Sequence, residues 1–127
     1  MGQYLIDNNA ISNFFAGNFT VIGMEFMAEV IDQTPIISVI TEIEALSWIS
    51  RDKTKEQVVQ SFVHDAHILA LTPAVVAQSV AIRRSRKIKT PDAIIAATAI
   101  IHQLTLITSD RDFNNIQGLT VLDPYSL

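Results

Sequence analysis

Residues 92–101 read DAIIAATAII, a stretch that is apolar on nearly every face of a helix. A surface helix has one polar face, whereas a helix that is apolar all round has to be covered by other elements. Thr90 and Pro91 stand just before it, and this pair is a common start signal for a helix. The sequence therefore predicts a central, buried helix that begins with Thr90 as its cap.

Segments that favour strands alternate with segments of helical periodicity along the rest of the chain. Strands are predicted at residues 3–7, 36–38, 67–71, 104–108 and 119–122. Further helices are predicted at residues 8–16, 20–31, 39–49 and 54–66, and from residue 72 into a basic stretch at 83–89. Cap signals accompany three of these helices: Asn18 or Thr20, the capping-box pair Thr54 and Gln57, and Thr72 before Pro73.

Strands that alternate with helices imply parallel crossover connections. We therefore expect a single domain over residues 1–127, built as a three-layer α/β sandwich. Its central parallel sheet would have four to five strands, flanked by helices. In such sheets ligands bind beyond the carboxyl ends of the strands.

Length and composition restrict the class of protein. The 127 residues suit one domain, and a hydrophobic fraction of 49% can build a core. The absence of cysteine excludes disulfides and cysteine-rich zinc sites. No segment reaches the ~20 apolar residues that a membrane span needs, and the N-terminus lacks a signal-peptide pattern. We expect a soluble, cytoplasmic protein that does not enter a membrane.

The net charge of −4 disfavours nucleic-acid binding through the whole surface. One stretch nevertheless holds five cations and no acid: Arg83, Arg84, Arg86, Lys87 and Lys89. This stretch is either the solvated end of a helix, where cations complement the dipole, or a rim that contacts phosphates.

Five carboxylates fall where the predicted topology brings them to one edge of the sheet. Asp7 closes the first strand, and Asp110 and Asp112 follow the fourth. Glu44 and Asp92 lie in the early turns of helices that the same geometry can bring there. Acids crowded in a cleft repel one another and raise each other's pKa, so a cation is expected to neutralise them. Carboxylate oxygens suit Mg²⁺ or Mn²⁺, which could activate a water against a phosphodiester.

Each acid also has a structural interpretation. Asp7 could cap the next helix, although a neighbouring amide can do so and leave Asp7 free. Glu44 could complete a capping box, and Asp92 is favourable near a helix N-terminus. Asp110 and Asp112 could simply form a turn.

Four segments occur in an order that resembles a known family: YLIDNNAIS (4–12), ISVITEIEAL (37–46), KTPDAIIAATAI (89–100) and LTLITSDRDF (104–113). The chain resembles the PIN-domain ribonucleases, and specifically the VapC-type toxins of bacterial toxin–antitoxin pairs. The resemblance extends over essentially the whole chain. It implies a PIN-like parallel α/β sandwich with a carboxylate cluster that binds Mg²⁺ or Mn²⁺.

Matched motif by motif, the resemblance implies that Asp7, Glu44 and Asp92 are the first three acids of the site. Glu42 competes with Glu44, but it lies about half a helical turn away and should face elsewhere. The fourth acid stays open between two residues of TSDRDF, because this motif has an acid where the family often has Asn and one residue fewer before the final Asp-Phe. The two candidates are Asp110 and Asp112.

Asn9 and Thr108 match polar positions that usually buttress the acids of this family. The altered first motif, Asp7-Asn8-Asn9, keeps the aspartate and the final amide. The basic residues at 83–89 would then be candidates for substrate binding beside Asp92.

The resemblance implies a metal-dependent endoribonuclease in which a metal-held water attacks RNA in line. It also implies structured RNA such as tRNA as the substrate, a homodimer, and a small antitoxin protein that places Arg or Lys among the acids.

Two other functions fit parts of the pattern. An inactive PIN-like scaffold that only binds partners would keep the fold without the reaction. A phospho-receiver domain needs an Asp after its third strand and a Lys after its fifth, and neither is present here. The three histidines, His64, His67 and His102, show no spacing typical of a metal site.

Overall fold

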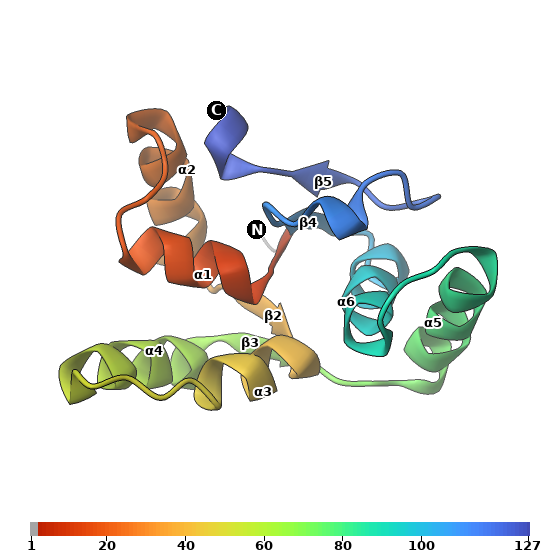
Figure 1. Cartoon of the computed structure of the whole chain (residues 1–127), viewed down its shortest axis with the longest axis horizontal. Helices are drawn as coiled ribbons and strands as arrows, with labels where there is room; N and C mark the ends of the chain where they lie inside the picture. The colour runs from red at the N-terminus through yellow and green to blue at the C-terminus, as the bar shows by residue number, and fades with distance from the viewer. Residues whose placement is uncertain (1–2) are drawn as a thin grey trace.

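The computed structural model describes residues 3–127 and shows strands alternating with helices (Figure 1). The strands are β1 (Tyr4–Ile6), β2 (Ile36–Ser38), β3 (His67–Leu69), β4 (Thr105–Ile107) and β5 (Val121–Leu122). The α-helices are α1 (Asn8–Phe15), α2 (Val21–Asp32), α3 (Val39–Leu46), α4 (Lys53–Asp65), α5 (Pro73–Ser85) and α6 (Thr90–Ile101). Two 3₁₀ turns complete the chain, η1 (Arg111–Phe113) and η2 (Pro124–Ser126).

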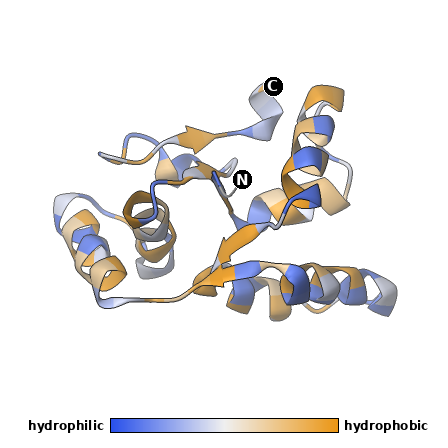
Figure 2. Cartoon of the chain, turned by 180° about the vertical axis from the view of Figure 1, so that it is seen from behind, coloured by the Kyte–Doolittle hydropathy of each residue, from blue (hydrophilic) through white to orange (hydrophobic). Residues whose placement is uncertain are grey.

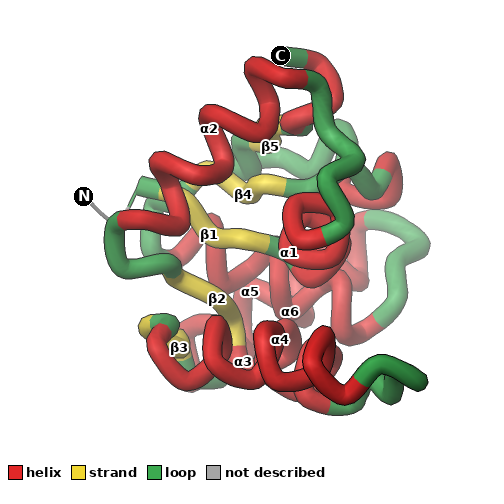
Figure 3. Tube along the Cα trace, turned by 90° about the vertical axis from the view of Figure 1, so that its left-hand side faces the viewer, coloured by secondary structure: helices red, strands yellow, loops and turns green. Residues whose placement is uncertain are grey.

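The predicted parallel pairing is confirmed, but the strands form two ladders instead of one continuous sheet. One ladder has the order β1-β4-β5 and the other pairs β2 with β3, all in parallel. β1 and β2 lie side by side without a ladder between them, so the strands follow one another as β3, β2, β1, β4, β5 (Figure 3).

Successive residues of each strand serve opposite faces, which produces the three layers of the sandwich. Leu5 and Leu106 belong to the core that packs against α5 and α6. Their neighbours Ile6 and Ile107 belong to the core that packs against α1, α2 and α4. The strands are accordingly rich in hydrophobic residues, whereas α4 is mixed in hydropathy (Figure 2).

Helix α6 is the buried central helix that its sequence predicts. Its fully or nearly fully buried residues are Ala93, Ile95, Ala96, Ala97, Thr98 and Ala99. The small alanines let α5 pack closely alongside it. None of the helices between residues 3 and 127 is long and apolar enough to cross a membrane.

Two of the predicted helix caps are confirmed. The hydroxyl of Thr20 accepts a hydrogen bond from the N–H of Gly23 at 3.0 Å. The hydroxyl of Thr72 accepts one from the N–H of Val75 at 3.3 Å. Each hydroxyl satisfies a donor that the first turn of a helix leaves unpaired.

Two other cap predictions are wrong. Helix α4 starts earlier than its capping-box pattern indicated, because Asp52 accepts a hydrogen bond from the N–H of Thr54 at 2.9 Å. Thr90 does not cap α6 but already belongs to it, and the preceding Lys89 makes no side-chain cap bond. Pro91 then occupies the second helical position, and because proline has no backbone N–H, it cannot donate a hydrogen bond to a capping side chain.

Candidate metal centre

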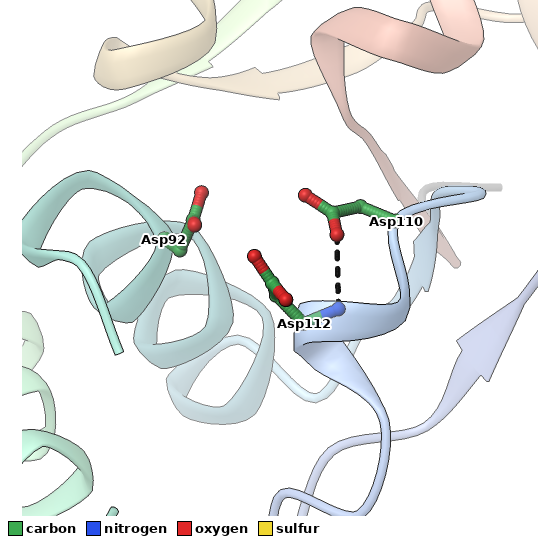
Figure 4. A group of neighbouring side chains, drawn as sticks. All are labelled: Asp92, Asp110 and Asp112. Carbon is green, nitrogen blue, oxygen red and sulfur yellow. Dashed lines mark hydrogen bonds between the residues drawn. The ribbon is translucent and has the colours of Figure 1, made fainter. Parts of the chain in front are cut away.

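Asp92, Asp110 and Asp112 converge on one point between α6 and η1. Each offers one carboxylate oxygen, and these oxygens all lie within 4.8 Å of one another. Figure 4 shows the three side chains turned toward a common space, Asp92 from the first turn of α6 and the other two from the turn after β4. Three oxygens at this spacing can ligate a single small cation.

The turn after β4 is held by the acids themselves. One carboxylate oxygen of Asp110 accepts a hydrogen bond from the N–H of Asp112 at 2.9 Å, as the dashed line in Figure 4 marks. The side chain of Phe113 is only 1% exposed and anchors η1 against α6. Asp110 therefore shapes the turn with one oxygen while its other oxygen stays free to face Asp92.

Asp7 lies at the carboxyl end of β1 and is only 6% exposed. One of its oxygens accepts a hydrogen bond from the N–H of Asn8, and the other accepts one from the hydroxyl of Thr108, both at 2.8 Å. The expectation that an amide would cap α1 and leave Asp7 free is wrong. Asp7 caps α1 itself, and Asn8 and Asn9 lie inside the helix.

Thr108 is the centre of the polar network under the acids. Its side chain is fully buried, and its hydroxyl donates to Asp7 while it accepts from the amide of Asn9 at 3.2 Å and from the N–H of Asp110 at 3.1 Å. One hydroxyl thus ties the end of β1, the start of α1 and the acidic turn together. Asn9 and Thr108, which the family resemblance implies as supports of the acids, are thus bonded to each other, and Thr108 also to Asp7 and Asp110.

Sequence reasoning missed an outer part of this network. The N–H of Ser109 donates to Asn9 at 3.3 Å, and its hydroxyl donates to Asp123 at 2.9 Å. Ser109 lies within the TSDRDF motif and could have been suspected. No sequence pattern indicated a role for Asp123, because only the pairing of β5 with β4 brings it next to Ser109.

Burial and mutual repulsion disturb the ionisation of these acids. Burial, first, raises the pKa of Asp7, and the charges of Asp92 and Asp110 raise it further, although hydrogen bonds from Thr108 and Asn8 act in the opposite direction. Partial burial likewise raises the pKa of Asp92, with the charges of Asp110 and Asp112 as the next causes.

Glu44 belongs electrostatically to the same group. It lies on α3 with its side chain exposed, and its pKa is raised by partial burial of the carboxyl and then by the charges of Asp7 and Asp92. The choice of Glu44 over Glu42 stays a prediction. The structure does not bring it into the close trio of Asp92, Asp110 and Asp112.

These acids form no short ion pair with a described side chain, although the charge of Lys89 opposes the larger effect of burial on the pKa of Asp92. Within residues 3–127 the one ion pair shorter than 4.0 Å joins Lys53 to Glu56, on α4. A set of hard oxygen donors without an ion-pair partner fits Mg²⁺ or Mn²⁺, which prefer carboxylates and retain bound water. Asp92, Asp110 and Asp112 are the residues placed to hold such an ion.

The family model described as "PIN domain" matches residues 4–119. The chain belongs to the PIN domain family. No curated protein matches it at a significant level.

Solved structures resemble this PIN domain over nearly its full length. A toxin–antitoxin complex from Klebsiella pneumoniae contains a chain that is 32% identical, with a TM-score of 0.76, covering 96% of this chain and 98% of that one. FitAcB from Neisseria gonorrhoeae is 25% identical with a TM-score of 0.78, covering 98% and 99%. VapBC2 from Rickettsia felis, bound to a DNA fragment from its promoter, is 18% identical with a TM-score of 0.72, covering 94% and 97%. The resemblance to VapC-type toxins is thereby confirmed, and family and neighbours together support a nuclease toxin.

Two of the five cations at residues 83–89 form side-chain hydrogen bonds, and these bonds lead to different parts of the PIN domain. The guanidinium of Arg83 donates to the carbonyl of Ile88 at 3.2 Å, within the α5–α6 connection. That of Arg86 instead reaches the acidic turn after β4. The side chains of Arg84, Lys87 and Lys89 are exposed and make no hydrogen bond or ion pair within the described part of the chain. The stretch thus contains two arginines bonded to the protein's own backbone and three free cations, whose role in substrate binding stays a prediction.

A cleft of about 600 Å³ lies between α1, α3 and α4 of this PIN domain. Apolar side chains line most of it, among them Ile11, Trp48, Val58 and Val59. Glu44 and Lys55 are the charged residues of its lining, so among the candidate acids the cleft reaches Glu44.

Proposed function

We propose that this PIN domain is a metal-dependent endoribonuclease that acts as the toxin of a toxin–antitoxin pair. The observation that carries the proposal is the convergence of Asp92, Asp110 and Asp112, with Asp7 and Glu44 nearby. Within residues 3–127 none of these acids forms an ion pair shorter than 4.0 Å. A set of acids that raise one another's pKa is costly unless a cation occupies it. Membership of the PIN domain family, and neighbours solved as toxin–antitoxin complexes, support the assignment to this class.

In the proposed mechanism each acid has a distinct place. Asp92, Asp110 and Asp112 would hold the Mg²⁺ or Mn²⁺ ion, and the buried Asp7 is oriented by Thr108. When bound, the ion would supply a water of lowered pKa and neutralise charge on the phosphodiester. Glu44, near Asp7 and Asp92, would accept a proton from the attacking water.

The exposed cations of the basic stretch are proposed to contact the RNA backbone. Arg84, Lys87 and Lys89 lie at the end of α5 and in the connection that leads directly to Asp92. Contacts between cations and phosphates provide affinity that does not depend on base sequence and is weakened by salt. A structured RNA such as tRNA is the proposed substrate class.

The apolar cleft is proposed to receive the antitoxin. A segment with an apolar face would cover Trp48 and its neighbours, and an Arg or Lys beside it would reach Glu44 and the metal ligands. Such a cation would replace the metal as the partner of the acids. A homodimer is also proposed, and the exposed Val76 and Val80 of α5 supply an apolar surface for it.

The proposal is tested by incubating the purified protein with total RNA, with and without Mg²⁺ or Mn²⁺. Asp7→Asn and Asp92→Asn should each lower the cleavage rate by at least about 100-fold, because the site then lacks a charge that positions the cation. Asp65→Asn, at the end of α4 and outside the cluster, is the matched control and should cleave normally.

Cleavage that persists in both variants, or that proceeds after removal of divalent metal, would sink the mechanism. A protein that binds Mn²⁺ and an antitoxin but cleaves no RNA would instead be an inactive PIN scaffold.

A further inference from the structure

Arg86 links the α5–α6 connection to the turn that carries two of the acids. Its Nη1 donates to the backbone carbonyl of Asn114 at 2.9 Å, and its Nη2 donates to that of Asp112 at 3.3 Å. The donors of a guanidinium are fixed in one plane. Two bonds to two carbonyls of the same turn therefore fix the orientation of that turn as well as its distance.

Both ends of this link are anchored in the fold. The backbone N–H of Arg86 donates to the carbonyl of Ile82 at the end of α5, and Ile88 beyond it is buried in the core. At the other end, Phe113 is buried between the two carbonyls that Arg86 contacts. Arg86 thus connects one rigid part of the molecule to another, across a sequence separation of 26 residues to Asp112.

Charge pairing does not account for this arginine. Within residues 3–127 it makes no ion pair shorter than 4.0 Å, so its charge does not neutralise an acid directly. Its Nε is buried and has no hydrogen-bond partner among the described residues. A buried N–H without a partner is unfavourable, and departures of this kind are expected where function requires a particular geometry.

We propose that Arg86 is a positioning residue for the acidic site. By holding the main chain at Asp112 and Asn114, it keeps the carboxylates of Asp110 and Asp112 turned toward Asp92. This inference rests on the proposed metal-dependent function. Arg86 acts through the backbone of the turn and touches neither the cation nor the reacting phosphate.

The direction in which metal affinity changes when Arg86 is replaced distinguishes an effect of its charge from an effect of positioning. If Arg86 influenced the site only by its charge, its removal would leave the acids more attractive to a cation, and metal affinity would rise. If Arg86 positions the ligands, its removal lets the turn move, and metal affinity falls. Residues that orient metal ligands typically change affinity by about 10–100-fold when they are replaced.

The experiment compares Arg86→Gln, Arg86→Lys and a control, Arg51→Gln. Arg51 is exposed in the α3–α4 loop, and its replacement removes the same charge away from the site. Three quantities are measured: Mn²⁺ affinity, hydrogen exchange of residues 110–115 without metal, and RNA cleavage as a function of Mn²⁺ concentration.

We expect Arg86→Gln to bind Mn²⁺ at least about 10-fold more weakly and to exchange faster at residues 110–115. Its cleavage should recover in part at high Mn²⁺. Arg86→Lys keeps the charge but cannot bridge two carbonyls with a planar fork, so it should resemble Arg86→Gln. Arg51→Gln should match the unmodified protein in all three measurements.

Unchanged or tighter Mn²⁺ binding in Arg86→Gln would overturn the inference, as would full recovery in Arg86→Lys. If the unmodified protein neither binds Mn²⁺ nor cleaves RNA, the proposed function fails. The exchange of residues 110–115, measured without metal, still decides in that case whether Arg86 holds the turn.

Discussion

At the scale of single residues, the hydroxyl of Thr108 organises more of the site than any carboxylate does. It donates to Asp7 and accepts from Asn9 and from the backbone of Asp110. Because a hydroxyl has one proton and two lone pairs, these three bonds use all of its capacity. Thr108, the residue after β4, thereby orients the carboxylate of Asp7 and fixes the backbone at the start of the acidic turn.

Thr108→Val should destabilise the protein by about 1–3 kcal/mol, because it leaves buried polar groups without partners while the volume hardly changes. It should also weaken Mn²⁺ binding, since Asp7 and the acidic turn lose their common support. Urea denaturation and Mn²⁺ titration measure the two effects.

Thr98→Val is the matched control for this substitution. Thr98 is also buried, but its hydroxyl donates only to the carbonyl of Ile94 in its own helix. It should leave Mn²⁺ affinity unchanged. Equal effects of the two substitutions on Mn²⁺ affinity would contradict the role given to Thr108.

The two glutamates of α3 provide a second test at the residue scale. Partial burial raises the pKa of Glu44, and the charges of nearby Asp7 and Asp92 raise it further. Glu44→Gln should lower the cleavage rate by at least about 10-fold with little change in stability, as expected for a group that holds a proton or water. Glu42→Gln should have no such effect, and a reversed result would show that the wrong glutamate has been assigned.

At the scale of elements, the C-terminal turn η2 depends on a glycine in α2. A Cβ added at Gly23 would lie 2.5 Å from the backbone carbonyl oxygen of Pro124. The ring of Tyr125, next to Pro124, packs edge-on against Phe19 with 4.8 Å between the ring centroids, so η2 also contacts the segment just before α2. Helix α2 and η2 therefore fit together only while position 23 lacks a side chain.

Gly23→Ala should destabilise the protein by about 1–3 kcal/mol, since overpacking costs more than the gain in helix propensity. Thermal or urea unfolding measures this change. The same substitution in a chain shortened by residues 124–127 should be neutral or slightly stabilising. A loss that persists in the shortened chain would show that η2 is not the cause.

At the scale of the whole molecule, the acids link stability to pH and to metal. Asp7, Glu44 and Asp92 all have a pKa raised above the ordinary values of 3.8 for Asp and 4.5 for Glu. The folded state therefore binds protons more tightly than the unfolded state. Their contribution to stability is fully present below those ordinary values and is lost as pH rises through the raised pKa values.

The free energy of unfolding of the metal-free protein should thus fall as pH rises from about 4 toward neutrality. The change should be modest, because Glu44 and Asp92 keep contact with water. Mg²⁺ or Mn²⁺ should restore the loss, and more so at pH 7 than at pH 5, because protons compete with the cation. Urea denaturation at several pH values measures both effects.

Asp92→Asn should flatten this dependence on pH and remove most of the stabilisation by metal. A metal-free protein that is more stable at neutral pH than near pH 4, and that gains nothing from Mn²⁺, would contradict this account of the site.

Local sequence patterns were sufficient for the elements. The apolar run of α6 predicted a buried helix, and the hydroxyls of Thr20 and Thr72 were found as caps. Errors arose where two local candidates competed. Asp52 outcompeted Thr54, and Asp7 outcompeted the amides beside it, because both carboxylates reach the first free N–H groups of their helices.

The sequence by itself determined the order of strands and helices, the burial of α6 and the choice of five candidate acids. Only the tertiary structure decided that Asp92, Asp110 and Asp112 form the close trio while Asp7 is buried behind them. It alone disclosed the bridge from Arg86 to the acidic turn. The physical reason is sequence separation: Thr108 and Asp7 bond across 101 residues, and local patterns specify elements but not the distances between them.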